Sequence, residues 1–142
     1  MLEDTLHCCL YFTAGRLSRV INKYAEEEFQ IIGLSPTYAL LLMIVNDRKE
    51  ISPTELSEKL HISPSTTTRF LDKLESKELI RRTFSGRNAL ITATEKSNQL
   101  QPQIEKAWDN LYHRYSKILG YKEGAHLTKL IDQAGGKLED EK

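Results

Sequence analysis

The sequence has little cysteine, no net charge and no long apolar run. Its two cysteines, Cys8 and Cys9, are adjacent, so they cannot form the spaced disulfide framework of a small secreted domain. No apolar segment approaches the roughly 20 residues of a membrane-spanning helix, and the N-terminus lacks the basic and apolar regions of an export signal. The 142 residues, 28% of them charged, predict one globular domain in the cytoplasm without a membrane partner.

Catalytic and metal-binding signatures are missing as well. No glycine-rich phosphate loop is present, and the four histidines are scattered at His7, His61, His113 and His126. No Cys-x-x-Cys or His-x-x-x-His spacing would bring metal ligands together. We therefore predict no catalytic residue, no metal site and no cofactor, and we do not expect an enzyme.

The most informative stretch is an amphipathic helix that is predicted to begin after Ser63. Ser63 is a favourable N-cap, and Pro64 stands at the first helical position, where proline is well tolerated. Residues spaced three and four apart form one apolar stripe: Thr67, Phe70, Leu71 and Leu74. The opposite side carries hydroxyl and charged side chains: Ser65, Thr66, Arg69, Asp72 and Lys73. Taken alone this is an ordinary surface helix, but its polar side also suits the DNA major groove.

The neighbouring segments favour DNA recognition. Upstream, Ser52 and Glu55 form a capping box that starts a second, short helix, and only a tight connection separates the two helices. Helices joined this closely form a helix-turn-helix, in which the second is the recognition helix. Downstream, residues 79–84 and 89–92 are predicted strands around a turn at 85–88. A β-hairpin directly after a recognition helix is a wing.

Charge is unevenly distributed although the chain is neutral. Residues 60–93 hold six basic and three acidic side chains, net +3, whereas residues 1–34, 35–59 and 94–142 have net charges of −2, −1 and 0. The helix-turn-helix and wing therefore form a local basic patch on a neutral body. The residues that we expect to contact DNA are Ser63, Ser65, Thr66, Arg69, Lys73, Arg82 and Arg87.

Two helices are predicted before this module. Residues 2–29 follow a continuous helical pattern in a segment that ends at Gly33. The acidic run at residues 26–28, near the end of this helix, is expected to be solvated. Ser35-Pro36 starts the next helix, which is apolar through residues 38–45, so it should be buried on nearly every side.

Two further helices are predicted after the wing. Thr94 can cap a long helix that ends at Gly120, and Pro102 should kink or break it. The last helix should run from about residue 121 to residue 134, where the two glycines at 135–136 stop or loosen it. The acidic tail that follows is expected to fray.

The terminal helices carry more apolar surface than the central module can cover, and exposed apolar faces usually find a partner. A homodimer held by residues 1–34 and 94–142, around a DNA-binding module at 35–93, is the simplest arrangement. Its symmetry would place two recognition helices roughly 34 Å apart, one turn of DNA. The predicted fold is thus mostly α with a small β-hairpin wing, a winged helix-turn-helix flanked by dimerisation helices. The expected interface residues are Leu6, Leu10, Trp108, Leu111, Tyr115, Leu127 and Ile131.

These residues resemble the multiple-antibiotic-resistance regulator (MarR) family of winged helix-turn-helix repressors. The resemblance lies in I-S-P-S-T-T-T-R-F-L-D-K-L-E-S-K from Ile62, L-I-R-R from Leu79 and R-N-A-L-I-T-A-T-E-K from Arg87, and helix order agrees along nearly the whole chain. It implies an obligate homodimer that binds palindromic operators through a wing in the minor groove. It also implies a cleft for small-molecule effectors between the dimerisation helices and the DNA-binding module.

The chain departs from the family pattern at two places. The wing is short, and only Arg87 matches the arginines that the family usually carries there, so the minor-groove role is transferred to Arg87 alone. Glu78 stands where the family usually has glycine after the recognition helix. Because glutamate adopts a left-handed backbone only at a cost, we expect the helix to run one or two residues longer.

The adjacent cysteines are candidate redox residues. A thiol-based branch of the family has a reactive cysteine in its first helix, close before a tyrosine, and Tyr11 follows Cys9 closely here. Cys9 shares a helical face with Leu6 and Thr13, so it is expected to be buried and inert. Cys8 is one turn from Tyr11 and is the better candidate for a sensing thiol.

Together these features predict a cytoplasmic, homodimeric transcriptional regulator, most simply a repressor, that binds double-stranded DNA at palindromic operators. A small-molecule ligand or thiol oxidation would release it. Neutral overall charge leaves open an alternative, a winged-helix protein-assembly module with only weak DNA binding.

Overall fold

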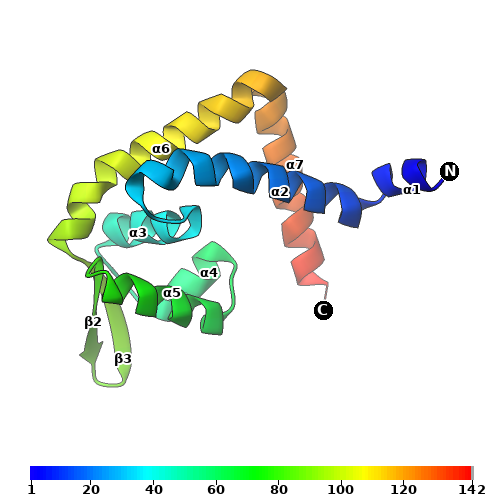
Figure 1. Cartoon of the computed structure of the whole chain (residues 1–142). Helices are drawn as coiled ribbons and strands as arrows, with labels where there is room; N and C mark the ends of the chain where they lie inside the picture. Colours follow the sequence, from blue (N-terminus) through cyan, green and yellow to red (C-terminus); the bar gives the residue numbers. More distant parts are fainter. Residues whose placement is uncertain (142) are drawn as a thin grey trace.

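The computed structural model describes residues 1–141, which are mostly helical with one small antiparallel sheet (Figure 1). This confirms the predicted fold class. The elements in order are α1 (Leu2–His7), α2 (Leu10–Phe29), the 3-10 helix η1 (Gln30–Ile32), α3 (Pro36–Arg48), β1 (Glu50–Ile51), α4 (Pro53–Leu60), α5 (Pro64–Ser76), β2 (Ile80–Ser85), β3 (Asn88–Ala93), α6 (Glu95–Leu119) and α7 (Tyr121–Asp140).

Hydroxyl side chains start four of the helices as predicted. Ser35, Ser52, Ser63 and Thr94 are the N-caps of α3, α4, α5 and α6, and each accepts a hydrogen bond from the backbone N–H three residues later. The capping box at α4 is only half formed, because the Glu55 carboxylate pairs with Arg48 at 2.9 Å instead. Local sequence therefore fixes where the helices of the central module begin.

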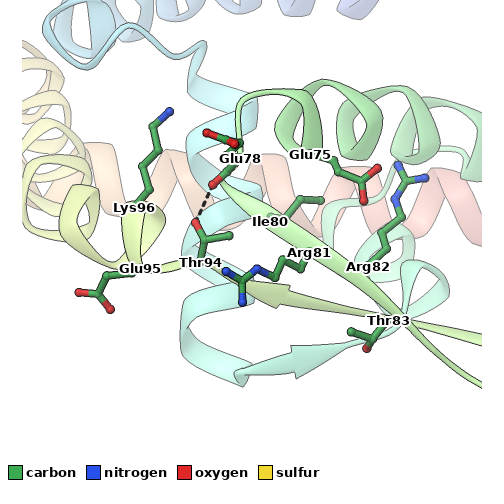
Figure 2. A pocket seen from close by; sticks show the side chains of 9 residues that line it. All are labelled: Glu75, Glu78, Ile80, Arg81, Arg82, Thr83, Thr94, Glu95 and Lys96. Atoms are coloured by element: carbon green, nitrogen blue, oxygen red, sulfur yellow. Dashed lines mark hydrogen bonds between the residues drawn. The ribbon is translucent and has the colours of Figure 1, made fainter.

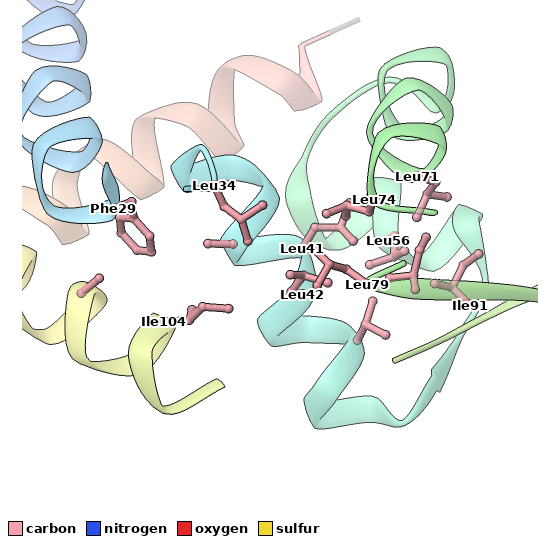
Figure 3. Packing of buried hydrophobic residues seen from close by; sticks show 14 of the residues in the cluster. Phe29, Leu34, Leu41, Leu42, Leu56, Leu71, Leu74, Leu79, Ile91 and Ile104 are labelled. Carbon is pink, nitrogen blue, oxygen red and sulfur yellow. The ribbon is translucent and has the colours of Figure 1, made fainter. Parts of the chain in front are cut away.

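Helix α3 lies at the centre of the hydrophobic core, as its apolar sequence predicted. Its buried residues Leu41 and Leu42 lie near Leu56, Leu74 and Ile104, which come from α4, α5 and α6 (Figure 3). In addition, α3 contacts β1 and β3. A single core thus joins the helix-turn-helix and the sheet to the long helix α6.

The sheet has the order β1-β3-β2, and β2 and β3 form the wing. Ser85 pairs with Asn88, so the turn has two residues, Gly86 and Arg87, rather than the predicted four. Gly86 has a φ of +67°, which glycine adopts without strain and which the first position of a tight hairpin turn requires. The two-residue strand β1, which pairs with β3, was not predicted from the sequence because it is too short to show a pattern.

The prediction of one continuous helix over residues 2–29 is wrong. The helix breaks at Cys8 and Cys9, where Cys9 has extended backbone angles, φ −95° and ψ 121°. Residues 1–11 are all exposed. Helices in proteins depend on packing, and cysteine is a poor helix former, so nothing holds the two segments in one line.

The predicted end of the last helix is also wrong. Helix α7 continues through Gly135 and Gly136 to Asp140, so the start of the acidic tail is helical rather than frayed. Glycine in a helix costs about 1 kcal/mol relative to alanine, which weakens the helix without forbidding it. Pro102 likewise lies inside α6 without ending it. The first turns of α6, yellow-green in Figure 1, run in a different direction from the rest.

Within residues 1–141, no single helix is long and apolar enough to cross a bilayer. The segments Leu10–Ile32 and Pro36–Arg48 are bent by 65° to each other, and they reach the required length and apolar character only when they are counted together.

Candidate nucleic-acid interface

The polar side of α5 begins with a cluster of hydroxyl groups. The Ser63 hydroxyl accepts a hydrogen bond from the backbone N–H of Thr66 at 3.2 Å and donates one to the Thr66 hydroxyl at 2.8 Å. The Ser65 hydroxyl lies 3.2 Å from that of Ser63. Further along the same side, Arg69 and Lys73 are exposed. Short groups thus occupy the N-terminal turn and long cations the following turns, as base and phosphate contacts require.

A buried pair of hydroxyls fixes how α5 packs on α4. Ser57 of α4 and Thr67 of α5 lie 2.7 Å apart and are 7% and 1% exposed. Each hydroxyl also lies 3.1 Å from a carbonyl one turn earlier, Ser57 from that of Pro53 and Thr67 from that of Ser63, so one hydroxyl donates to its partner and the other donates to its carbonyl. Because buried polar groups need such partners, this pair specifies one crossing of the two helices. The apolar stripe predicted that Thr67 faces the core, but no local pattern indicated that Ser57 is its partner.

The wing is connected to the recognition helix by an ion pair. Arg82 of β2 donates to the carboxylate of Asp72 of α5 at 2.6 Å. Arg82 was predicted to contact DNA, and its guanidinium is instead directed at α5. Arg87 occupies the exposed hairpin turn, where it matches the predicted wing-tip cation.

The C-terminal end of α5 differs from the prediction. Helix α5 ends at Ser76, and Glu78 adopts the left-handed backbone, φ +59°, that was thought too costly. Its amide donates to the Glu75 carbonyl at 2.9 Å, and the Leu79 amide donates to the Leu74 carbonyl at 3.0 Å. This is the Schellman arrangement that glycine usually makes, and the burial of Leu74 and Leu79 supports it here.

The start of α6 completes this junction. The Thr94 hydroxyl donates to the Glu78 carbonyl at 2.7 Å (Figure 2). The Lys96 ammonium donates to the Lys77 carbonyl at 2.8 Å. Both carbonyls lie just beyond α5, where the helix leaves acceptors without partners. The junction opens into a groove of about 590 Å³, lined by Glu75, Glu78, Ile80, Arg81, Arg82, Thr83, Thr94, Glu95 and Lys96.

Comparison with known proteins agrees with this geometry. The model of the MarR family matches residues 34–89, which span the helix-turn-helix and most of the wing. The uncharacterized HTH-type transcriptional regulator YdgJ of Bacillus subtilis is 30% identical over 113 residues, which cover 79% of this chain and 69% of that protein. The chain belongs to the MarR family.

Two transcriptional repressors are similar over more of the chain. The HTH-type transcriptional repressor MdtR of Bacillus subtilis is 24% identical over 137 residues, 92% of this chain and 88% of that protein. The solved structure of the transcriptional repressor CouR, bound to a 23-mer DNA duplex, has a TM-score of 0.84 at 19% identity and covers 92% of this chain and 94% of CouR. These relatives are transcriptional regulators, not enzymes. A riboflavin kinase of Pyrococcus furiosus also matches, 34% identical over 57% of this chain, but only 41% of the kinase is covered.

In the MarR-type body, α2 and α6 are joined by a charged cluster. Arg114 of α6 donates to Glu27 at 2.8 Å and to Glu28 at 3.1 Å, and it lies over the ring of Tyr24 at 4.1 Å. The hydrogen bond to Glu27 is the main reason that the pKa of Arg114 is raised. The acidic run was expected to be solvated, and Glu27 is exposed, but Glu27 and Glu28 also bind Arg114 and help fix α2 against α6.

The residues predicted for dimerisation differ in exposure. Leu111 is only 6% exposed and belongs to the core of the protomer itself, so its assignment to a partner-covered face is wrong. Trp108 is half exposed and packs edge-on against Phe29. Tyr115 is half-buried. The remaining members are exposed on the terminal helices: Leu6, Leu10, Leu127 and Ile131. Their role in a dimer stays a prediction.

A cavity of about 270 Å³ lies between α3 and α6, where the family resemblance implied an effector cleft. Its walls are mostly apolar and aromatic. They comprise Met43, Glu105, Trp108, Asp109, Leu111, Tyr112 and Tyr115.

Both cysteines are exposed. The predicted burial of Cys9 is therefore wrong, because the helix breaks there and Cys9 becomes the N-cap residue of α2. Tyr11 is 86% exposed, and among the described residues it makes no hydrogen bond to Cys8. Neither thiol is protected from an oxidant by the fold of the protomer.

Proposed function

We propose that this MarR-family regulator is a homodimeric repressor that reads palindromic operators in double-stranded DNA. The observation that carries the proposal is the arrangement of donors on the solvent-facing side of α5 and at the exposed wing tip. Ser65, Thr66 and Arg69 reach base edges in the major groove, Lys73 meets phosphate, and Arg87 enters the minor groove. The structure of CouR, a transcriptional repressor bound to a DNA duplex, supports this use of the shared fold.

Exposed apolar side chains support the dimer. Apart from Phe84, every large hydrophobic residue that is exposed in the described chain lies in residues 1–31 or 108–138. Many are aliphatic residues of α1, α2, α6 and α7: Leu2, Leu6, Leu10, Val20, Ile118, Leu119, Leu127, Leu130, Ile131 and Leu138. Covering these surfaces with a second copy removes them from water and sets two recognition helices one DNA turn apart. Sedimentation at micromolar concentration should give a dimer, and a stable monomer would contradict this arrangement.

Two release mechanisms follow from two different sites. A small aromatic or apolar ligand in the cavity between α3 and α6 would shift α6, which contacts the end of α5 through Thr94. Oxidation of Cys8 or Cys9 would instead alter the junction of α1 and α2. The ligand would act on α6 and oxidation on α1 and α2, and all three helices carry proposed dimer contacts.

The alternative function is a winged-helix module for protein assembly, with only weak DNA binding. Neutral overall charge favours it, whereas the net +3 of residues 60–93 favours DNA. The salt dependence of DNA binding separates the two. A dimer that neutralises several phosphates should show a steep fall of log K with log salt and a preference for one site. A shallow slope without sequence preference would support the assembly module.

A further inference from the structure

The wing carries an exposed aromatic ring. Phe84 of β2 is 72% exposed, and it is the only large hydrophobic residue between positions 35 and 107 that is exposed. Throughout the central module, other large apolar side chains are buried or half-buried in the core. Single exposed hydrophobic residues are common on proteins, so the position of Phe84 matters more than its exposure.

Strand geometry fixes the direction of this ring. Alternate residues of a strand share a face, so Phe84 lies on the same face of β2 as Ile80 and Arg82. Ile80 is buried and Arg82 contacts Asp72 of α5, which identifies this face as the one toward the recognition helix. Phe84 is further along the hairpin, beyond the ion pair, and its cross-strand partner Ala89 is too small to cover it.

The charges around Phe84 identify the kind of partner. Residues 79–94, which include both strands of the wing, contain three arginines and no acidic residue. Arg81 and Arg87 are exposed, and the hairpin projects beyond the body of the molecule near α5 (Figure 1). Arg82 is paired with Asp72, and Arg81 lies on the opposite face of β2, so a partner that enters the space between wing and recognition helix meets the apolar ring with Arg87 near it at the turn.

We propose that Phe84 packs on the deoxyribose of bound DNA, between the groove that α5 enters and the groove that the wing tip enters. The proposal rests on the DNA-binding function proposed above. Along each DNA strand a sugar lies between successive phosphates. An arginine that binds a phosphate therefore brings a neighbouring aromatic ring of the protein against that sugar. The contact is apolar, so it releases no counterion and reads no base directly.

These properties predict a distinct behaviour for Phe84→Ala. The variant should bind operator and non-specific DNA about tenfold more weakly, as expected when a large side chain loses an apolar contact. The slope of log K against log salt should remain that of the unmodified protein, since no charge is removed. Phe84→Leu should retain part of the affinity. Melting temperatures should be unchanged, because the ring is exposed.

A matched control is Thr83→Ala, which changes the neighbouring exposed residue on the opposite face of β2. It should bind DNA like the unmodified protein. Equal affinity of Phe84→Ala and unmodified protein would overturn the proposal, and so would a loss confined to the operator, which would place the ring at a base step. Absence of any specific binding by the unmodified protein would instead refute the underlying DNA-binding function.

Discussion

The Thr94 hydroxyl donates a hydrogen bond to the Glu78 carbonyl at 2.7 Å and accepts one from the Ser97 amide at 3.2 Å. One side chain therefore holds the turn after the recognition helix and starts α6 at the same time. Thr94 is 8% exposed, so water cannot easily replace either bond. The long helix of the proposed dimer interface is thus attached directly to the end of the DNA-reading helix.

Thr94→Val should lower the free energy of unfolding by about 2 kcal/mol, because it removes both an N-cap and a hydrogen bond without changing the shape of the side chain. Thr94→Ser keeps the hydroxyl and should cost much less. Urea unfolding of the three proteins measures the difference. Equal losses for Val and Ser would show that the methyl group, rather than the hydroxyl, is what matters at this position.

Glu78→Gly should raise the free energy of unfolding by about 1 kcal/mol, because glycine adopts the left-handed conformation without the steric cost that glutamate bears. The control is Glu75→Gly in the last turn of α5, where glycine should cost about 1 kcal/mol. Thermal unfolding should therefore move in opposite directions for the two variants. A decrease for Glu78→Gly would mean that its side chain stabilises the junction more than its backbone strains it.

The different outcomes at these positions show what a sequence can predict. The N-caps at Ser35, Ser52, Ser63 and Thr94 were predicted because a cap depends on residues within one turn. The left-handed Glu78 was not, because its cost is offset by Thr94 and by the packing of Leu79, which local spacing does not reveal. Tertiary contacts overrode a local preference there.

At the proposed DNA-binding site, too, features set by local spacing were predicted, and contacts between residues distant in sequence were not. The exposed side of α5 followed from helical periodicity, whereas the partners of Arg82 and Arg114 lie 10 and 86–87 positions away along the chain. Arg82, which was assigned to the basic patch, and the acidic run that was expected to be solvated are therefore partly used in ion pairs. The break at Cys9 was missed for the opposite reason, since the helical pattern was present but no packing supports it.

Arg69→Ala should weaken operator binding by about 1–3 kcal/mol and relax sequence preference at one base pair in each half-site, because arginine can bind guanine through two hydrogen bonds. Competition with operators changed at single positions would locate that base pair. An equal loss on every DNA sequence would assign Arg69 to a phosphate instead.

Arg87→Ala should weaken binding and reduce the salt slope by about one unit for each contact that is lost. A suitable control is Lys106→Ala, which removes a cation from α6, next to η1 rather than to α5 or the wing. Its slope should not change. If Arg87→Ala leaves affinity and slope unaltered, the short hairpin does not reach the minor groove.

Mild peroxide should lower operator affinity if a thiol releases the protein, and replacement of the responsible cysteine by serine should prevent the loss. Cys8→Ser and Cys9→Ser are both needed, because both thiols are exposed. Loss of binding that only Cys8→Ser prevents would identify Cys8 as the sensor. Affinity that is indifferent to peroxide would assign release to a ligand in the cavity between α3 and α6.

The most direct test of the whole account is to select the DNA that the unmodified protein binds from a random pool of duplexes. Two symmetry-related recognition helices predict enrichment of an inverted repeat whose half-site centres are about 10 base pairs apart. Footprinting of the selected DNA should show protection of both half-sites. A pool that enriches no sequence, or a single unrepeated site, would contradict the proposal that this chain reads operators as a symmetric dimer.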